Sequence, residues 1–473
     1  MLLHLIRKEF HENLLNVRFI AACGVSLVLM ISSIAVLTRS HEELEQDYQS
    51  RVRQQDEFID KFGHINRLGW MSAISRGPSH LQALVLGVEK EAYQNNFISN
   101  PVPALLSRLD FVTIVTVIMS LVAILFSYNA VSGEREAGLL RQILGAGVSR
   151  KVLLTGKFLG GLFSLIIPFT ISVLAGMLFL ALSPSIQMQP ADFTVFALLL
   201  GASWIYVSTF YGIGLFFSTR SHTSAQAILK SMFAWVVLVL VVPNAGPFLA
   251  AQFYPIPSAT RLAQERYMIT DRERDAIVAQ RRHAMIESRF ADLKDIVDLP
   301  QNQVQERLKS DAALTERFKK FAREYDDIIG VTNREQSAKY EKLEEVFTQR
   351  SLVQEKIAGV LTSASPLSNF VFIATDLTET GLEADSHWDR EEGEYHLALN
   401  TYADAQYKKA MERDPAFDMN DYLDLRARPR FQYRPAGVLE RVEPDLSQWG
   451  VLIAFNLIFF AAAFVSFQRY DVR

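Results

Sequence analysis

The sequence predicts an all-α integral membrane protein with six transmembrane helices and a mainly helical extracytoplasmic domain. Hydrophobic residues make up 49% of the 473 residues and gather into blocks. A spanning helix needs about 20 mostly apolar residues, because the hydrocarbon core is about 30 Å thick. Charged residues fill the segments between the blocks, and in the longest segment their signs alternate at helical spacing. A soluble core of six buried helices is the weaker alternative.

Six apolar blocks have the required length. They cover residues 19–37, 109–128, 158–182, 193–217, 227–249 and 449–467. The first block is too long for a signal peptide and is not followed by a clear cleavage site, so we expect an uncleaved span. The fifth block carries Lys230 near one end, and Pro243 and Pro247 near the other. Because proline interrupts helical hydrogen bonding, we expect that end to be kinked or broken.

The composition excludes several classes of protein. The chain has 48 Lys and Arg against 52 Asp and Glu, a formal charge of −4, which argues against a nucleic-acid partner. Its one cysteine, Cys23, excludes an intrachain disulfide framework and a cysteine-based zinc site. Cys23 is expected to be a small packing residue of the first span.

Basic residues in the short loops predict the orientation, because such loops stay in the cytoplasm. The N-terminal segment 1–18 and the tail 468–473 are basic, whereas loop 183–191 has no Lys or Arg. With six spans, all basic segments fall on one side. We therefore expect a multi-pass protein of the cell (inner) membrane with both termini in the cytoplasm. The loop 129–157 contributes Arg135, Arg141, Arg150, Lys151 and Lys157.

Two long segments, 38–108 and 250–448, fall on the other side, and the second holds most of the charged residues. Helices are expected over 42–62, 364–380 and 388–413, and irregular chain over 415–444. Charges alternate over 260–297 and again over 301–361. Both an antiparallel hairpin turning near Pro300 and a compact helical domain fit this pattern, and the sequence leaves both open.

The loop between the second and third spans predicts a short helix, a glycine break and a second helix. Ser132 is a candidate N-cap, and Glu134 and Glu136 fall in the first turn, where carboxylates complement the helix dipole. Ser149 can cap the following helix. On the residues alone, an interfacial helix and a solvated turn both fit. An apolar stripe beside the arginines contains Leu139, Leu140 and Ile143.

This loop resembles the permease subunits of ABC transporters of the ABC-2 type. The similarity lies in a Ser-Gly-Glu-Arg-Glu-x-Gly run over 132–138, in Val-Ser-Arg over 148–150 and in Gly156-Lys157. Leu139 stands where threonine is usual. The N-terminal segment, with Arg7, Lys8, Glu9 and Phe10, resembles the interfacial helix of that family. The stretches 217–227 and 467–471 are also similar to family patterns, and 76–87 resembles a subgroup with a large insertion between spans five and six.

The resemblance implies that the loop is a coupling helix that docks on a separate ABC ATPase subunit, which binds ATP and Mg. The chain itself lacks the Gly-x-x-x-x-Gly-Lys-Ser/Thr motif, so we expect no enzyme activity and no cofactor of its own. A second copy or a related permease would pair with it in the membrane. The implied coupling residues are Ser132, Gly133, Glu134, Arg135, Glu136, Gly138, Leu139, Leu140 and Arg141.

Two further groups of residues are candidate sites. Trp204, Tyr206 and Tyr211 on the fourth span could line a substrate path or simply pack between helices. Between residues 385 and 396, His and Glu recur at i, i+4 and could share a metal. A solvated helix face is the favoured interpretation of that cluster, and no metal site is predicted.

The predicted function is the membrane subunit of an ABC transporter, with export as the usual direction. The alternative is a non-transporting scaffold or sensor whose outer helices bind an extracytoplasmic partner. A membrane-embedded enzyme is disfavoured, because the spans carry almost no His, Asp or Glu. The sequence does not disclose a substrate.

Overall fold

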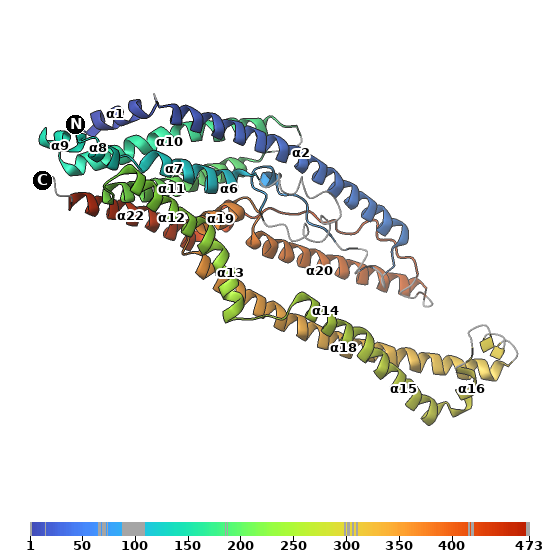
Figure 1. Cartoon of the computed structure of the whole chain (residues 1–473). Helices are drawn as coiled ribbons and strands as arrows, with labels where there is room; N and C mark the ends of the chain where they lie inside the picture. The colour runs from blue at the N-terminus through green and yellow to red at the C-terminus, as the bar shows by residue number, and fades with distance from the viewer. Residues whose placement is uncertain are drawn as a thin grey trace. The chain divides into compact units, whose positions relative to one another are not determined.

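The computed structural model describes residues 2–14, 16–64, 68, 72, 74–87, 109–184, 186, 188–297, 299, 303–304, 307–308, 311–414, 417 and 421–469. Every regular element in these residues is a helix, so the predicted all-α class is confirmed. The chain forms two compact units (Figure 1). The first comprises Met1–Asn244 and Thr362–Arg473, and the second comprises Ala245–Leu361.

In the part of the chain that the structure describes, six helices are long and apolar enough to cross a membrane, in agreement with the predicted number of spans. They are Phe19–Phe62, Phe111–Glu136, Arg150–Ala181, Pro190–Arg220, Ser224–Phe253 and Val438–Gln468. In the first unit, α1 (Leu2–Leu14) and the end of α22 (Leu446–Gln468) both contact the start of α10 (Arg150–Ala181). Both ends of the described chain therefore lie at one end of the helix bundle, here called the loop end (Figure 1).

The first span does not stop where its apolar block stops. Helix α2 runs from Val17 to Phe62 without a break, at 1.5 Å per residue a length of about 70 Å. Residues 38–62 contain no Gly or Pro and are rich in Glu, Gln and Arg, which favour helix. The helix ends directly before Gly63.

Spans two and five each contain a π-helical turn. Span two consists of α6 (Phe111–Thr113), the π turn η3 (Ile114–Met119) and α7 (Ser120–Ser127). Span five consists of α12 (Ser224–Trp235), the π turn η4 (Val236–Val241) and α13 (Val242–Phe253). The expected break near the prolines is therefore absent from span five. The helix continues through both prolines, and the irregularity is the π turn in front of Pro243.

A short apolar helix, α19 (Pro366–Leu377), packs against α11 (Pro190–Arg220) and α22 within the span bundle. The turn before it carries Ser365, whose Oγ donates to the carbonyl of Leu238 near the middle of span five. The sequence predicts that this segment belongs to the outer domain 250–448, whereas the structure packs α19 against the spans. Twelve residues are too few to span the hydrocarbon core, so counting long apolar blocks does not detect a helix of this kind.

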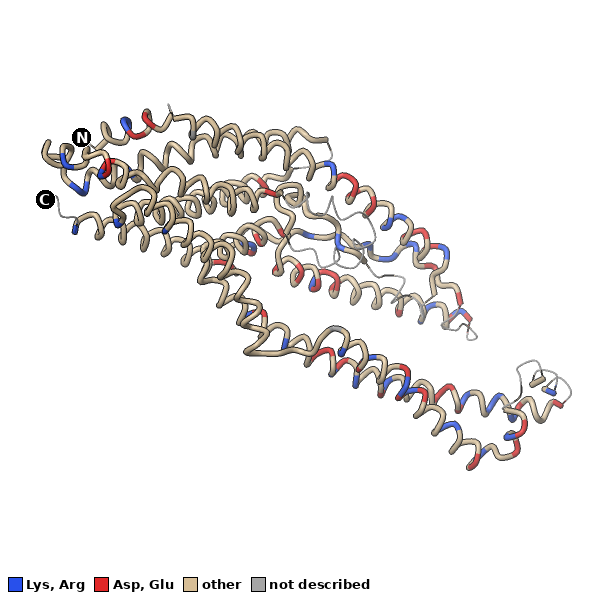
Figure 2. Tube along the Cα trace, viewed as in Figure 1, with Lys and Arg blue, Asp and Glu red and all other residues tan. Residues whose placement is uncertain are grey.

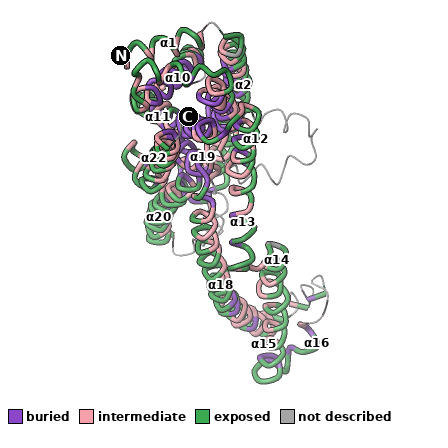
Figure 3. The backbone as a smooth tube through the Cα atoms, turned by 60° about the vertical axis from the view of Figure 1, so that its left-hand side comes forward, coloured by how far each residue is buried: buried purple, intermediate pink, exposed green. Residues whose placement is uncertain are grey.

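Side chains of the spans and of α19 form the main apolar core. The rings of Phe158 and Tyr211 lie 5.7 Å apart, and those of Tyr206 and Phe370 lie 5.1 Å apart. Figure 3 shows buried residues concentrated among α10, α11 and α19, whereas the helices of the second unit are mostly exposed or half-buried.

The second unit contains an antiparallel pair of helices, as in the hairpin arrangement predicted from the sequence, and the expected turning point at Pro300 lies outside the described residues. The first arm of the pair comprises α14 (Ala259–Tyr267), the π turn η5 (Met268–Glu273) and α15 (Arg274–Arg289). The second arm is α18 (Ala312–Thr362). Ion pairs join residues progressing in opposite directions along the two, namely Glu273–Lys339, Arg281–Glu335 and Arg289–Glu324. Figure 2 shows the alternating charges along both.

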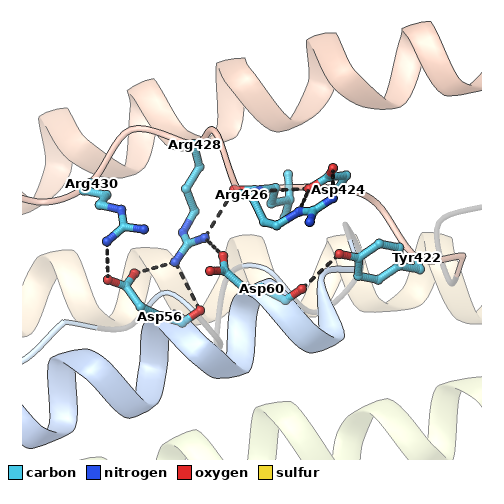
Figure 4. A network of polar contacts seen from close by, with 8 residues as sticks. Asp56, Asp60, Tyr422, Asp424, Arg426, Arg428 and Arg430 are labelled. Carbon is cyan, nitrogen blue, oxygen red and sulfur yellow. Dashed lines mark hydrogen bonds and ion pairs between the residues drawn. The ribbon is translucent and has the colours of Figure 1, made fainter.

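At the opposite end of the first unit from α1, the second half of α2 packs against α20 (Leu382–Arg413) and the extended segment 421–437. Their apolar contact includes Ile59, Leu399, Ala403 and Leu423. Beside it, the guanidinium of Arg428 forms ion pairs with both Asp56 and Asp60 of α2 (Figure 4). The Arg428 side chain is 1% exposed, so these pairs lie where water screens them least.

We predict that Arg428→Ala loosens segment 421–437 from α2, because it leaves Asp60 without its cation and Asp56 with Arg430 alone. Each aspartate keeps about a third of its surface exposed, so the loss of stability should be about 2 kcal/mol, below that of a fully buried pair. The apparent Tm of the chain in lipid nanodiscs measures it. Arg426→Ala is the control, since Arg426 pairs with Asp424 in the open and should change nothing. Equal Tm values for the two variants would contradict a stabilising role of the Arg428 ion pairs.

Candidate functional site

The loop between spans two and three folds as two short helices at the loop end of the first unit (Figure 1). They are α8 (Ser132–Glu136) and α9 (Leu139–Gly145), and Gly138 between them has a φ of 70°. Glycine adopts this left-handed conformation without steric cost, so the turn depends on it. Ser149 caps α10 as predicted, accepting from the amide of Val152. Ser132 does not cap α8, because its hydroxyl donates to the carbonyl of Tyr128 instead.

The start of α8 is tied to the end of α11 through Ser218. The Ser218 Oγ accepts from the amides of Val131 and Ser132, each at 3.0 Å, and lies 3.2 Å from the Ser132 hydroxyl. Ser132 and Ser218 are both fully buried. Three hydrogen bonds on one hydroxyl group therefore fix where α8 begins relative to span four.

Lys157 of α10 holds α8 and α1 together. Its Nζ donates to Glu9 Oε1 of α1 at 2.8 Å and to Glu134 Oε1 of α8 at 2.7 Å. The lysine side chain is 4% exposed, and the two glutamates 13% and 17%. One buried ammonium group with two carboxylates thus joins three elements. A buried charge is tolerated when it is paired in this way.

Two glycines of α10 allow α1 to approach closely enough for this contact. A Cβ at Gly160 would lie 2.7 Å from the Cβ of Glu9, and one at Gly156 would lie 3.0 Å from the Cβ of Leu5. Any larger side chain would push α1 away from α10. The Gly156-Lys157 pair noted in the sequence therefore has a local physical reason, which the sequence alone did not provide.

Arg135 and Glu136 bind the connection between spans four and five. The Arg135 guanidinium donates to the carbonyl of Ser221 at 2.6 Å and to that of Thr219 at 3.1 Å. Glu136 Oε2 accepts from the amide of Ser224, the first residue of α12, at 3.1 Å. Of the four charged residues expected to face an ATPase, Glu134, Arg135 and Glu136 are thus each engaged within the chain itself.

The solvent-facing part of the loop lies slightly further along the chain. We call it the loop face, comprising Ala137, Gly138, Leu139, Arg141 and Gln142, all of which are exposed. Leu139 is 48% exposed and Leu140 is 1% exposed. Leu140 therefore belongs to the core, whereas the side chain of the adjacent Leu139 is half-exposed at the surface.

The N-terminal helix α1 likewise has exposed and half-buried side chains among its residues 7–10. Arg7 and Lys8 are exposed, and Lys8 pairs with Glu12 at 3.5 Å in the open. Glu9 and Phe10 are half-buried, and Glu9 reaches Lys157. One face of α1 thus packs on α10 while the other remains free for lipid headgroups or solvent.

The three aromatic residues of span four make packing contacts. The Tyr206 hydroxyl donates to the carbonyl of Thr116 at 2.9 Å, and that of Tyr211 donates to the carbonyl of Lys157 at 3.2 Å; both side chains are buried. Trp204 is 39% exposed and donates to Thr170 Oγ1 at 3.1 Å. These contacts favour the packing interpretation, and the substrate path stays a prediction.

The described residues contain no group of three or more His, Cys, Asp or Glu side chains placed to hold a metal ion. In the cluster between residues 385 and 396, His396 Nε2 lies 3.5 Å from the carboxylate of Glu392, and His387 Nε2 lies 2.8 Å from the carbonyl oxygen of Arg434.

We predict that Lys157→Met destabilises the chain by about 3 kcal/mol, because it leaves two buried carboxylates facing each other. Replacing all three charges, in Lys157→Met/Glu9→Gln/Glu134→Gln, should restore most of that loss, since no uncompensated charge remains. The apparent Tm in nanodiscs compares the variants. A triple variant no more stable than the single one would show that the charges are not the cause.

Comparison with known proteins places this arrangement in a family. The ABC-2 family transporter protein profile matches residues 3–472. A probable ABC transporter permease protein, NosY of Pseudomonas aeruginosa, is 30% identical over 141 residues. That alignment covers 30% of this chain and 50% of NosY, so the chain spans about half the length of this relative. With a profile match over nearly its whole length, the chain belongs to the ABC-2 family of transporter proteins.

Proposed function

We propose that this ABC-2 permease subunit couples ATP hydrolysis on a separate ATPase subunit to a conformational change of its spans, with export as the direction of transport. The observation that carries the proposal is the loop of α8 and α9. Its first helix is bound to four other elements, through Ser218, Arg135, Glu136 and Lys157, and its loop face is exposed. A surface both exposed and rigidly connected to the spans is suited to receive force.

The connections specify how such a force would spread. A displacement of α8 acts on span four through Ser218, on the start of span five through Glu136, and on span three and α1 through Lys157. Differential binding of ATP by the open and closed ATPase pair would supply the free energy for the shift. The membrane subunit then needs no nucleotide site, and ATP and Mg remain on the partner.

The proposed location and orientation of the protein depend on where its loop end lies. It lies in the cytoplasm, where the ATPase is available, and the protein resides in the cell (inner) membrane with both termini on that side. A second copy or a related permease completes the transporter. The second unit and the outer part of α2 then lie on the extracytoplasmic side, where they could contact a further partner.

A scaffold or sensor without transport activity is the second candidate. The specific observation in its favour is the size of the helical pair in the second unit, which presents two long charged surfaces. Dependence on an ATPase distinguishes the two functions, because a scaffold does not require a matched ATPase.

We expect Leu139→Glu to lower ATPase association by about tenfold or more, because it places a charge at the centre of the docking surface. The chain is co-expressed with the ATPase encoded beside it and purified from membranes, and bound ATPase and ATP hydrolysis are measured. Leu139 is half-exposed, so the Tm should not change. Leu397→Glu is the matched control, a similar change at a 71% exposed leucine of α20.

Two results would contradict the proposal. If no ATPase purifies with the unaltered chain, the transporter assignment of this chain fails. If ATPase binds Leu139→Glu as well as it binds Leu397→Glu, the loop face is not the docking surface. Glu134→Ala/Arg135→Ala is a less selective test, because both side chains also support the fold.

A further inference from the structure

Among the described residues of the six spans, π turns occur in spans two and five. The first, η3, follows the three-residue helix α6 at the start of span two, and the second, η4, lies near the middle of span five. A π turn is rare, interrupts the regular hydrogen-bond ladder and is frequent at functional sites. It is also one of the few recognised causes of a bend in a helix. Two such turns in one helix bundle call for a structural explanation.

Pro243 explains the turn in span five. The amide of Val242 donates to the carbonyl of Val237, five residues back, instead of to Leu238. The next π-type donor to Leu238 would be residue 243, a proline, which has no N–H group. The Leu238 carbonyl thus loses both of its backbone donors. Inside a membrane it needs another partner, and the hydroxyl of Ser365 supplies it.

The turn in span two has the same kind of support. The carbonyl of Thr116 accepts from the hydroxyls of Ser120 and Tyr206. Thr116 is 3% exposed, and Ser120 and Tyr206 are fully buried. Each π turn therefore has a carbonyl whose partner is a side-chain hydroxyl from a neighbouring helix or from the next turn. A hydroxyl can rotate and follow its acceptor, which a backbone amide cannot do.

A single hydrogen bond connects the two turns. Trp235, the last residue before η4, donates from Nε1 to the Oγ of Ser120, the first residue after η3, at 2.8 Å. Trp235 is 8% exposed. The Ser120 hydroxyl then donates to Thr116. The chain of bonds runs from span five, through Ser120, into the π turn of span two.

We propose that the two π turns form one hinge, in which spans two and five bend together because the Trp235–Ser120 hydrogen bond joins them. The hinge lets α7 and α12, the loop-end parts of the two spans, move relative to the rest of each helix while the carbonyls of Thr116 and Leu238 keep a donor. Ser365 extends the connection to the tip of α19. The proposal concerns this chain alone and goes beyond ATPase coupling, so it stands or falls separately from that function.

Amide hydrogen–deuterium exchange of the full chain in lipid nanodiscs, without ATPase or nucleotide, tests the hinge. Trp235→Phe removes the donor and Ser120→Ala removes the acceptor. Trp204→Phe is the matched control, because Trp204 likewise donates from Nε1 to a hydroxyl, that of Thr170, across two spans without a π turn. Exchange is followed in residues 114–119 and 236–241, where it reports local opening.

We expect Trp235→Phe to speed exchange about five- to tenfold in both segments, the size of effect that loss of one buried hydrogen bond produces. Ser120→Ala should speed exchange in 236–241, across the bond, as well as in its own segment. Trp204→Phe should leave both segments unchanged. Should Trp235→Phe fail to fold, the response of 236–241 to Ser120→Ala decides the matter.

The proposal is overturned if each substitution affects only its own span, because the two turns would then be independent. It is also overturned if Trp204→Phe speeds exchange in both segments to the same extent, which would indicate general loosening of the bundle.

Discussion

A single buried ammonium group, that of Lys157, organises the loop end of this protein. A charge removed from water must be paired, so the lysine brings Glu9 and Glu134 to the same point. The first of these fixes α1 against the glycine face of α10, and the second fixes α8. The exposed loop face therefore projects from a rigid base, a condition for transmitting force into the spans.

Backbone hydrogen bonding imposes the second constraint, because no water is available in the hydrocarbon core. Span five keeps its helix through Pro243 by means of a π turn and a hydroxyl from Ser365. That hydroxyl belongs to the turn leading into α19, so the irregularity of one span and the position of α19 depend on each other. Irregular backbone is thus found where neighbouring side chains can supply the missing partner.

The far end of the first unit is held by different chemistry. Helix α2 carries the first span about 70 Å along one continuous axis, and Arg428 fastens the segment 421–437 to its outer half. That segment leads directly through α21 (Val438–Val442) into α22. The first and last spans are therefore connected at this end by the ion pairs of Arg428.

The sequence by itself determined the all-α class, the six spans and the family. Hydropathy over about 20 residues and a short motif are local properties of the chain, so they can be recognised without knowing how its segments pack. It also located the loop of α8 and α9. It did not show that Glu134 and Arg135 turn inward, that α19 enters the bundle, or that Arg428 meets Asp60. Lys157 and Glu9 are 148 residues apart, and Arg428 and Asp60 are 368 apart. The chain has 100 charged residues, and its sequence alone does not distinguish these pairings from many others. Only the packing of the helices excludes water from a few of them, and exclusion of water makes a particular pairing necessary.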